Sequence, residues 1–458
     1  MTQAVQTLII LGASGDLTSR LLLPALGQVL TKDPARRVTF IGAGSQDWTK
    51  AHWRHVVRTS FAASKAEGPA VDALLASTEY VSMDVTVPAD LKALLARAEG
   101  TPALYFALPP AVTKVTCAAL AEVDLPKETR LALEKPFGTD RRSAAALNRK
   151  IATLVPENQV HRIDHFLGNS TVQNLFGLRF ANRIFEPLWS SQHISRVDIV
   201  YDETLGLVGR AGYYDHAGAL VDMLQSHLLQ VLAVTAMEAP ATLSADDLRD
   251  AKEILLRATR VWDDDPVASS HRGRYTKGKI GRTILPSYVD EKGVDPELET
   301  ETLAQITFAI DNWRWAGVPF TLRSGKAIGV PRHEIVLTFR DAQHVPQGLR
   351  GVAHPTRLRL RLGPDEMTLE LNTNGPGDPK FLSRAKLEAE FGAGTLVAYG
   401  EVLADLLDGD PSLSVRGDTA EECWRIVDPV IAAWRKDEVP IDDYAAGSEG
   451  PENWPAIP

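Results

Sequence analysis

The sequence predicts a protein of the α/β plus α+β class, with a parallel-sheet domain over residues 1–164 and a larger, mainly antiparallel β+α domain over residues 165–458. In the first part, short apolar segments alternate with helical patterns, which indicates parallel strands joined by crossover helices in a doubly wound sheet. After about residue 165, strand patterns follow one another with fewer helices between them, which favours an antiparallel sheet. A length of 458 residues is enough for two or three domains, each with its own core.

The elements of the first part are short. A helical pattern from Leu17 to Leu30 follows the first strand. The expected strands are Thr7–Leu11, Val38–Ile41, Tyr80–Met83, Ala103–Ala107 and Leu131–Leu133.

The second part contains longer alternating strands and a Pro/Gly-rich tail, Gly447–Pro458, that is expected to be irregular. Helices are expected over Thr171–Asn182 and near Ala219–Met237 and Leu396–Leu407. The expected strands are Arg196–Tyr201, Leu303–Ile310, Glu334–Phe339, Arg357–Leu362 and Glu366–Asn372.

The composition is that of an ordinary soluble globular protein, with 44% hydrophobic and 24% charged residues. The net charge of -10 argues against a protein that coats nucleic acid, because such proteins bind by neutralising phosphates. Cys117 and Cys423 cannot form a disulfide framework or a metal motif, so we expect a reducing compartment and no metal. No segment resembles a signal peptide or reaches the ~20 apolar residues of a membrane span, which predicts a cytoplasmic protein without a membrane partner.

A glycine-containing turn follows the first expected strand and opens the first helix: Gly12, Ala13, Ser14, Gly15, Asp16 and Leu17. Glycines allow a tight turn and let a pyrophosphate approach backbone N–H groups at a helix N-terminus, where the dipole favours negative charge. The spacing departs from the full G-x-G-x-x-G fingerprint, so the motif alone also fits a plain strand–helix turn. Its place in an alternating strand–helix pattern favours dinucleotide binding.

The choice between NAD and NADP is made at the end of the second strand. An acidic residue there binds the ribose hydroxyls of NAD, whereas an arginine accepts the 2′-phosphate of NADP. Ser45 is neither, so both cofactors stay open, and Ser45 can equally be an ordinary loop residue.

A series of motifs spread over almost the whole chain carries a specific resemblance. In chain order they are Gly15–Leu17, Tyr105–Pro110, Glu134–Gly138, Arg162–Gly168, Leu178–Asn182, Gly209–Asp215, Asp222–Gln230, Met237–Pro240, Asp311–Trp315, Val318–Phe320, Arg323–Lys326 and Tyr444–Pro451. By these motifs the chain resembles the glucose-6-phosphate dehydrogenase family. The resemblance implies a Rossmann-like coenzyme domain and a β+α domain whose large sheet forms a homodimer or homotetramer.

The implied reaction is hydride transfer from C1 of glucose 6-phosphate to NADP or NAD, giving 6-phosphogluconolactone in the pentose phosphate pathway. Two alternatives remain open. The substrate could be another phosphosugar or an unphosphorylated aldose, or the chain could be a non-catalytic paralogue that keeps the fold and the cofactor.

Oxidation of a C1 hemiacetal requires a base for the hydroxyl proton, and a histidine suits this task because its pKa lies near working pH. The resemblance makes His227 the base and Asp164 the carboxylate that orients its ring. Without the resemblance, a lone histidine in a helix would more often be structural.

The resemblance also assigns binding roles. Glu203 and Asp222 would accept hydrogen bonds from sugar hydroxyls, for which carboxylates are well suited. His165 and Lys326 would contact the substrate phosphate, and Lys135 would lie near both nicotinamide and sugar. The remaining cofactor contacts would come from Ala107, Leu108 and Pro109, in addition to the turn Gly12–Leu17 and Ser45.

Several positions depart from the family pattern. Phe166 stands where the family usually has tyrosine. Asn169 and Leu21 stand where the family usually has lysines on the substrate side, and Asn169 is still expected to bind the substrate. Each hydrogen bond to a charged group contributes roughly 1.5–3 kcal/mol, so the loss of a lysine and a tyrosine could cost about 3–6 kcal/mol. That is on the order of a hundred- to ten-thousandfold in affinity unless another cation, such as Arg162 or Arg323, compensates.

Two further departures lie in the helix that carries His227. Val221 and Ser226 stand where the family usually has arginine and asparagine.

Overall fold

The computed structural model describes residues 6–207, 209, 211–375, 377–392 and 394–458, so Arg210 of the Gly209–Asp215 motif lies outside the described residues. The chain divides into two compact units. Unit 1 comprises Met1–Asn169, Pro240–Ala251 and Gly394–Glu422, and unit 2 comprises Ser170–Ala239, Lys252–Ala393 and Cys423–Pro458. The first boundary lies close to residue 165, whereas Pro240–Ala251 and Gly394–Glu422, which were expected in the second domain, belong to unit 1.

Unit 1 is built on a seven-stranded sheet with the strand order β18-β6-β5-β4-β1-β2-β3. Its strands are β1 (Gln6–Leu11), β2 (Val38–Gly44), β3 (Glu79–Ser82), β4 (Thr101–Phe106), β5 (Arg130–Glu134), β6 (Val160–Ile163) and β18 (Ser414–Val415). Strands β1 to β6 are parallel, and β18 pairs antiparallel with β6. The order 3-2-1-4-5-6 is that of a Rossmann-like fold, with its switch point between β1 and β4.

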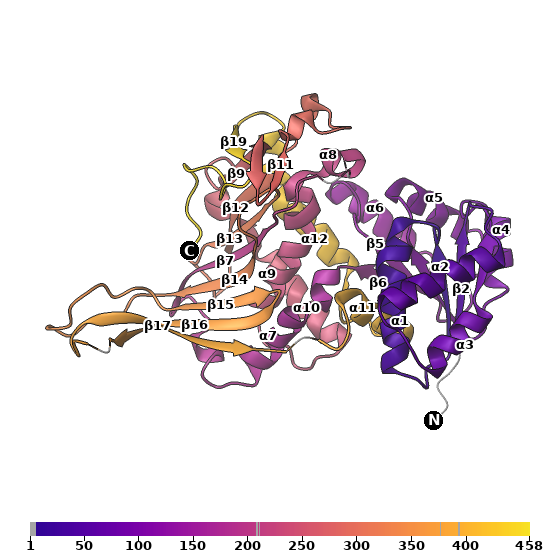
Figure 1. The fold of residues 1–458 in the computed structure, drawn as a ribbon, viewed down its shortest axis with the longest axis horizontal. Coiled ribbons are helices and arrows are strands. Elements are labelled where there is room, and N and C mark those ends of the chain that lie inside the picture. Colours follow the sequence, from indigo (N-terminus) through magenta and orange to yellow (C-terminus); the bar gives the residue numbers. More distant parts are fainter. Residues whose placement is uncertain (1–5, 208, 210, 376, 393) are drawn as a thin grey trace. The chain divides into compact units, whose positions relative to one another are not determined.

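Two groups of helices cover this sheet (Figure 1). The first consists of α1 (Leu23–Lys32), α2 (Lys50–Ala63), α3 (Pro69–Ser77) and α11 (Ala398–Asp408), and the second of α4 (Pro88–Leu95), α5 (Pro110–Leu120) and α6 (Arg141–Ile151). Shorter helical turns are η1 (Thr18–Leu22), η2 (Glu157–Gln159) and η3 (His165–Gly168). Helix α11 packs against α1 and contributes Leu403 and Leu406 to the core of unit 1, which is why its late segment belongs there.

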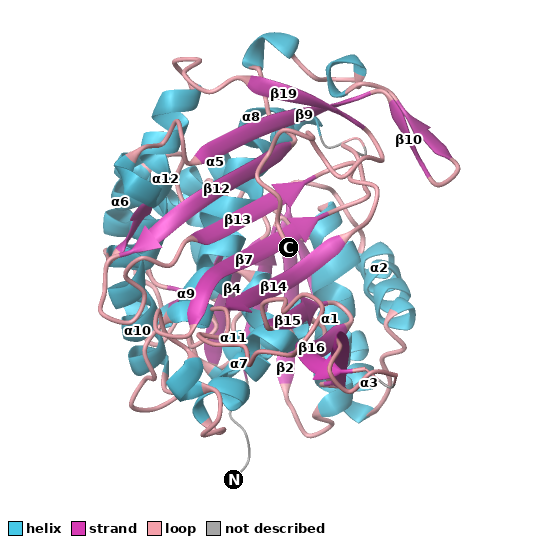
Figure 2. Cartoon of the chain, turned by 90° about the vertical axis from the view of Figure 1, so that its left-hand side faces the viewer, coloured by secondary structure: helices cyan, strands magenta, loops and turns pink. Residues whose placement is uncertain are grey.

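Unit 2 contains a ten-stranded sheet with the order β17-β16-β15-β14-β7-β13-β12-β9-β19, and β8 pairs with β12 (Figure 2). Most neighbours are antiparallel, while β7 and β13, and also β9 and β19, run parallel. The strands are β7 (Ile194–Asp202), β8 (Thr259–Val261), β9 (Ser270–Thr276), β12 (Leu303–Ile310), β13 (Phe320–Gly325), β14 (Arg332–Phe339), β15 (Arg357–Leu362), β16 (Asp365–Asn374), β17 (Leu382–Glu390) and β19 (Ile441–Ala445). A separate hairpin is formed by β10 (Gly278–Ile280) and β11 (Thr283–Leu285).

The helices of unit 2 are α7 (Ser170–Phe180), α8 (Ala211–Ala219), η5 (Leu220–Leu228) and α9 (Leu229–Ala236), with short turns η4 (Glu186–Leu188), η6 (Trp262–Asp264), η7 (Tyr288–Asp290) and η8 (Pro296–Leu298). Helices α10 (Ala245–Arg257) and α12 (Gly417–Trp434) each contribute residues to both units. The helical run Ala211–Ala236 is long and apolar enough to cross a membrane, but 83% of its most apolar window is buried, as in a core helix.

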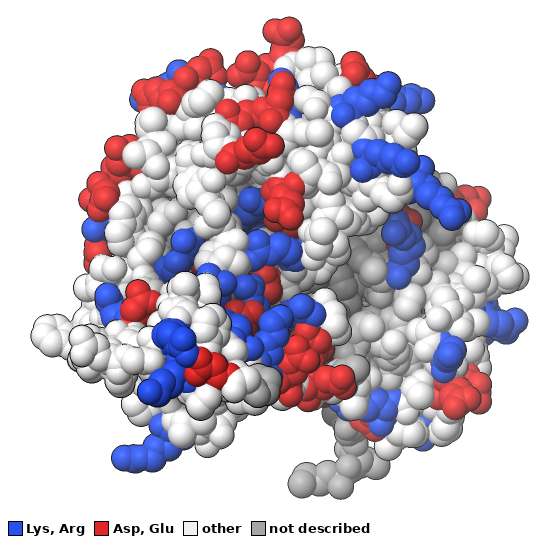
Figure 3. Space-filling view, turned by 60° about the vertical axis from the view of Figure 1, so that its left-hand side comes forward, with Lys and Arg blue, Asp and Glu red and all other residues white. Residues whose placement is uncertain are grey.

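Paired charges cross the large sheet from strand to strand. Glu334 lies between Arg332 and Arg359, and Glu370 lies between Arg359 and Arg384. The C-terminal tail is irregular, as predicted, and the guanidinium of Arg332 donates to the Pro458 carbonyl at 2.7 Å. Basic and acidic side chains accordingly lie close to one another on the face shown in Figure 3.

Candidate active site

The residues expected to hold the cofactor meet at one edge of the unit 1 sheet. Asp164, Lys135, Ala107, Gly12 and Ser45 follow directly after β6, β5, β4, β1 and β2, which are five neighbouring parallel strands. Carboxyl ends of parallel strands share one edge, and ligands of such sheets bind there at the switch point. The strand order therefore brings together residues that are far apart in sequence.

Gly12 can be nothing but glycine at this edge. Its φ is +82°, and a Cβ on it would clash with the carbonyl oxygen of Ala107 and lie 2.9 Å from a methyl group of Leu108. The Gly12 and Ala13 N–H groups both donate to the Ala43 carbonyl, at 2.8 and 3.0 Å. The turn is thus tied to the end of β2, and the missing side chain at Gly12 lets the backbone that follows β4 pack directly against it.

The end of β2 carries polar side chains next to an aromatic group. Ser45, Gln46 and Asp47 are exposed. A Cβ added to Gly44 would lie 2.9 Å from the Tyr80 hydroxyl and 3.4 Å from Oγ of Ser14, so these two hydroxyls flank the turn. Burial raises the pKa of Tyr80, an effect that the Ser14 side chain partly offsets.

Trp48 and Tyr80 were not predicted as site residues. Their ring centroids lie 5.2 Å apart, and Tyr80 is also 5.5 Å from the buried Trp53. The half-buried Trp48 comes three residues after Ser45, but that spacing alone does not distinguish a ligand contact from core packing.

The half-buried Glu134 ends β5 at the same edge. Tyr105 donates a short hydrogen bond to Glu134, and the Tyr399 side chain is a second partner of this carboxyl. Burial raises the pKa of Glu134 to about 7, an effect that Tyr105 and Lys135 partly offset. The peptide bond between Lys135 and Pro136, the two residues that follow Glu134, is cis.

Asp164 and His165 occupy the turn after β6. Asp164 is buried, and its Oδ1 accepts from the Phe166 N–H at 3.1 Å, which caps η3. The His165 ring stacks on Tyr399, with centroids 5.3 Å apart and planes at 12°, and contacts the edge of Phe166. Tyr399 therefore links His165 to Glu134, a connection between distant segments that no local spacing signals.

In unit 2, helix η5 carries the other members of the predicted set. Asp222 and His227 are both buried, and the Tyr213 hydroxyl donates to Oδ1 of Asp222 at 3.4 Å. The Ser226 hydroxyl turns back to the Asp222 carbonyl at 3.3 Å. The helix has π-type hydrogen bonding, a local geometry that is often found at functional sites.

Glu203 and Lys326 lie side by side in unit 2. Strands β7 and β13 are parallel with Asp202 opposite Gly325, so the next residue of each strand reaches the same edge. Lys326 Nζ lies 2.8 Å from Oε2 of Glu203 and 5.1 Å from the centre of the Tyr214 ring. The cation expected to bind phosphate and the carboxylate expected to bind sugar hydroxyls are thus neighbours.

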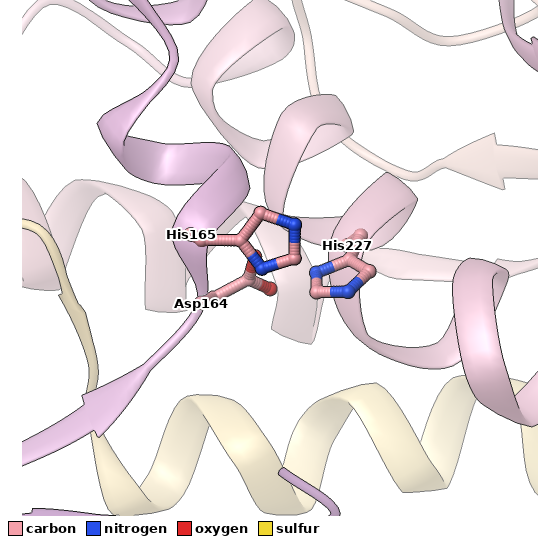
Figure 4. Close-up of side chains that lie close together, drawn as sticks. All are labelled: Asp164, His165 and His227. Carbon is pink, nitrogen blue, oxygen red and sulfur yellow. The ribbon is translucent and has the colours of Figure 1, made fainter. Parts of the chain in front are cut away.

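Figure 4 shows the side chains of Asp164 and His165, which follow β6 in unit 1, and that of His227, which η5 carries in unit 2. A histidine can accept and release a proton near neutral pH, and a carboxylate can orient its ring.

The departures from the family pattern have different surroundings. Leu21 is 43% exposed on η1, whereas Phe166 is buried. Neither arginine suggested as a compensating cation is free for that task. Arg162 pairs with Glu157 at 2.6 Å, and Arg323 pairs with Asp202 at 2.9 Å.

Comparison with known proteins identifies the relatives of this chain. The family description "Glucose-6-phosphate dehydrogenase, NAD binding domain" matches residues 9–174, and "Glucose-6-phosphate dehydrogenase, C-terminal domain" matches residues 176–457. The chain belongs to the glucose-6-phosphate dehydrogenase family. Relatives named glucose-6-phosphate 1-dehydrogenase include one from Gluconobacter oxydans, 39% identical over 97% of this chain and 94% of the relative, and one from Treponema pallidum, 37% identical over 98% and 93%.

Solved structures of the family agree with this placement. The glucose-6-phosphate 1-dehydrogenase from Mycobacterium avium superposes with a TM-score of 0.85 at 34% identity, covering 98% of this chain and 95% of the other. A glucose-6-phosphate dehydrogenase in complex with its substrate glucose 6-phosphate gives a TM-score of 0.86 at 28% identity, covering 98% and 96%. The predicted fold class and the family resemblance are both confirmed.

Proposed function

We propose that this protein is a glucose-6-phosphate 1-dehydrogenase, which oxidises C1 of glucose 6-phosphate to 6-phosphogluconolactone with transfer of hydride to a nicotinamide cofactor. The observation that supports it most is the family match, which covers residues 9–174 and 176–457 and so includes both Asp164 and His227. The product would feed the pentose phosphate pathway.

In this proposal His227 is the general base. A ring nitrogen of His227 accepts the proton of the C1 hydroxyl while hydride leaves from the same carbon. Asp164 holds the imidazole in the required tautomer and stabilises its protonated form. The Asp164 carboxylate is itself fixed, because one of its oxygens accepts from the Phe166 N–H.

The cofactor would be held along the carboxyl edge of the unit 1 sheet. The glycine turn fits a dinucleotide, because it follows β1 at the carboxyl edge of the sheet, precedes the first helix, and has at Gly12 the positive φ of a tight glycine turn. Ser14, Asp16 and Leu17 would complete the cradle at the start of the helix, and Pro109 and Lys135 would line the nicotinamide end. When bound, the nicotinamide supplies the hydride acceptor.

The substrate would be held by both basic and acidic side chains. Lys326 and His165 would contact the phosphate, and Glu203 and Asp222 would accept hydrogen bonds from the sugar hydroxyls. Lys326 and Glu203 form an ion pair, so a substrate bound by one of these side chains would also lie close to the other.

A second candidate is oxidation of a different phosphosugar or an unphosphorylated aldose. It is favoured by the exposed Leu21, by Phe166 and Asn169, and by the pairing of Arg162 and Arg323 with other carboxylates. All of these weaken the anion-binding side of the site relative to the family pattern.

One assay separates these functions: reduction of NAD and NADP with glucose 6-phosphate, glucose and related aldoses as substrates. We expect glucose 6-phosphate to give the highest kcat/KM, by at least tenfold over glucose, since one charged hydrogen bond is worth about 1.5–3 kcal/mol. A higher kcat/KM with a neutral aldose would establish the second candidate. No turnover with any sugar, together with measurable cofactor binding, would indicate a non-catalytic paralogue.

The Ser45→Arg variant tests the cofactor edge. An arginine at the end of β2 can pair with a 2′-phosphate, so we expect kcat/KM for NADP to rise about ten- to a hundredfold relative to NAD. Ser45→Ala is the matched control and should change the ratio less than threefold. An unchanged ratio in Ser45→Arg would show that the 2′-position does not lie at this residue.

The expected location is the cytoplasm, in line with the two free buried cysteines, Cys117 and Cys423. Interspersed charges on the face in Figure 3 do not favour nucleic acid as a partner. By resemblance to the family, the large sheet of unit 2 would form the interface of a homodimer or homotetramer.

A further inference from the structure

Helix η5, which carries Asp222 and His227, starts at an unusual junction within unit 2. Gly218, the residue before the last of α8, has φ 65° and ψ 179°, so it breaks the helical run just before η5 begins. The backbone N–H groups of the next two residues both donate to Glu301. Ala219 donates to the Glu301 carbonyl at 3.2 Å, and Leu220 donates to the side-chain Oε1 at 2.9 Å.

Gly218 and Glu301 fit each other closely. A Cβ on Gly218 would clash with both carboxylate oxygens of Glu301, and its positive φ would strain any other residue. The absence of a side chain at Gly218 therefore allows a carboxylate from a distant segment to reach the first N–H of η5. This arrangement replaces the usual N-cap, since the residue before η5, Ala219, has no side-chain cap.

The position of this contact matters for the proposed chemistry. Leu220 is the first residue of η5, and His227 follows about two turns later on the same helix. The hydrogen bond at the first residue restrains the position of the helix start. A displacement of about 1 Å at a reacting group can cost a hundredfold in rate, so a loosened helix start would reach the base.

We propose that Glu301 is a positioning residue for the dehydrogenase reaction, which holds the start of η5 so that His227 and Asp222 keep their places. This inference rests on the proposed function. Glu301 acts through the helix and is not assigned a contact with substrate or cofactor.

The surroundings of Glu301 agree with a fixed carboxylate. Glu301 is 8% exposed, and the nearby cation Arg272 is itself held by Asp437 at 3.0 Å and by the Val439 carbonyl at 2.7 Å. A cavity of about 540 Å³, lined by Glu301, Gly218, Arg272 and their neighbours, reaches the start of η5. A freed helix end would therefore have open space beside it.

The test compares Glu301→Leu with Glu301→Gln. Leucine removes the acceptor, so we expect kcat to fall ten- to a hundredfold while KM for the cofactor stays within twofold. Glutamine keeps a side-chain oxygen at the same place, so Glu301→Gln should retain kcat within about threefold of the wild type. A folded Glu301→Leu enzyme with wild-type kcat would overturn the proposal, and so would a Glu301→Gln enzyme that is as slow as Glu301→Leu.

A second pair of variants covers the case in which Glu301→Leu does not fold. Gly218→Ala pushes a methyl group against the carboxylate and should lower kcat at least tenfold. Gly212→Ala in α8 is the matched control, because a Cβ there meets open space, and it should keep wild-type kcat. Equal activity of the two variants would contradict the proposal.

A readout independent of catalysis separates this inference from the proposed function. Hydrogen–deuterium exchange of residues 219–228 should rise in Glu301→Leu and Gly218→Ala, and should not rise in Glu301→Gln or Gly212→Ala. If the wild type oxidises no sugar but shows this exchange pattern, the proposed function fails while the helix restraint stands. If the wild type is active and exchange is unchanged, the restraint alone is wrong.

Discussion

Replacing His227 with Asn is expected to lower kcat by about a hundred- to ten-thousandfold, because a positioned general base contributes on that scale. The carboxamide is close in size to the imidazole but cannot accept the C1 hydroxyl proton at neutral pH. Binding of glucose 6-phosphate, measured by calorimetry, should stay within about threefold, since His227 is assigned to proton transfer and not to the phosphate. Steady-state reduction of the cofactor gives kcat.

His216→Asn provides the matched control. His216 is an exposed histidine on α8, the helix that precedes η5, and it has no assigned role in the reaction. We expect wild-type kcat from this variant. Unchanged turnover in His227→Asn would refute its role as the base, and His165 would be the next histidine to test.

The strands could be predicted because their signal is local. Every strand expected from the sequence overlaps an observed one, and Leu303–Ile310 and Arg357–Leu362 match β12 and β15 residue for residue. Strand β17 (Leu382–Glu390) was missed because it lies at the end of the sheet order with every residue at least partly exposed, so its sequence lacks a buried alternating face.

The division of the chain could not be read from sequence, because it depends on contacts between distant segments. Residues 394–422 return to unit 1 through Leu403, which joins its core, and through Ser414, which lies opposite Ile163 in the sheet. The sequence around Leu403 looks like that of any amphipathic helix, and the sequence around Ser414 looks like that of any short strand. The expected helix start at Ala219, by contrast, coincides with the kink at Gly218.

Contacts between distant segments also limit what the sequence predicts about the site. Motifs predicted Asp164, Lys135 and Gly12, the end of the second strand predicted Ser45, and the strand order explains why these residues share an edge. Residues that support these groups from elsewhere, such as Tyr399 under His165, have no motif of their own. The reacting residues can be predicted from one sequence because the residues next to them form recognisable motifs. The residues that orient them come from distant segments and are identified only from the structure.

Asp164→Asn should lower kcat by about a hundred- to ten-thousandfold with little change in stability, which separates orientation of the base from folding. The carboxylate has two tasks: Oδ1 caps η3 through the Phe166 N–H, and the proposal has the group orient His227. An asparagine can keep its carbonyl oxygen toward Phe166, and its NH₂ group then takes the place of the second oxygen. That group donates where the imidazole needs an acceptor, so the ring would adopt the wrong tautomer.

The comparison with Asp164→Ala tests this division of tasks. Alanine loses the cap as well, so its free energy of unfolding should fall by about 0.5–2 kcal/mol relative to Asp164→Asn, as measured by denaturant titration. Both variants should be slow, because neither presents an acceptor to the imidazole. If Asp164→Asn kept kcat within fivefold of the wild type while His227→Asn was inactive, the base would have to be oriented by another group. His165, which follows Asp164 in the chain and stacks on Tyr399, would be the next residue to test for that role.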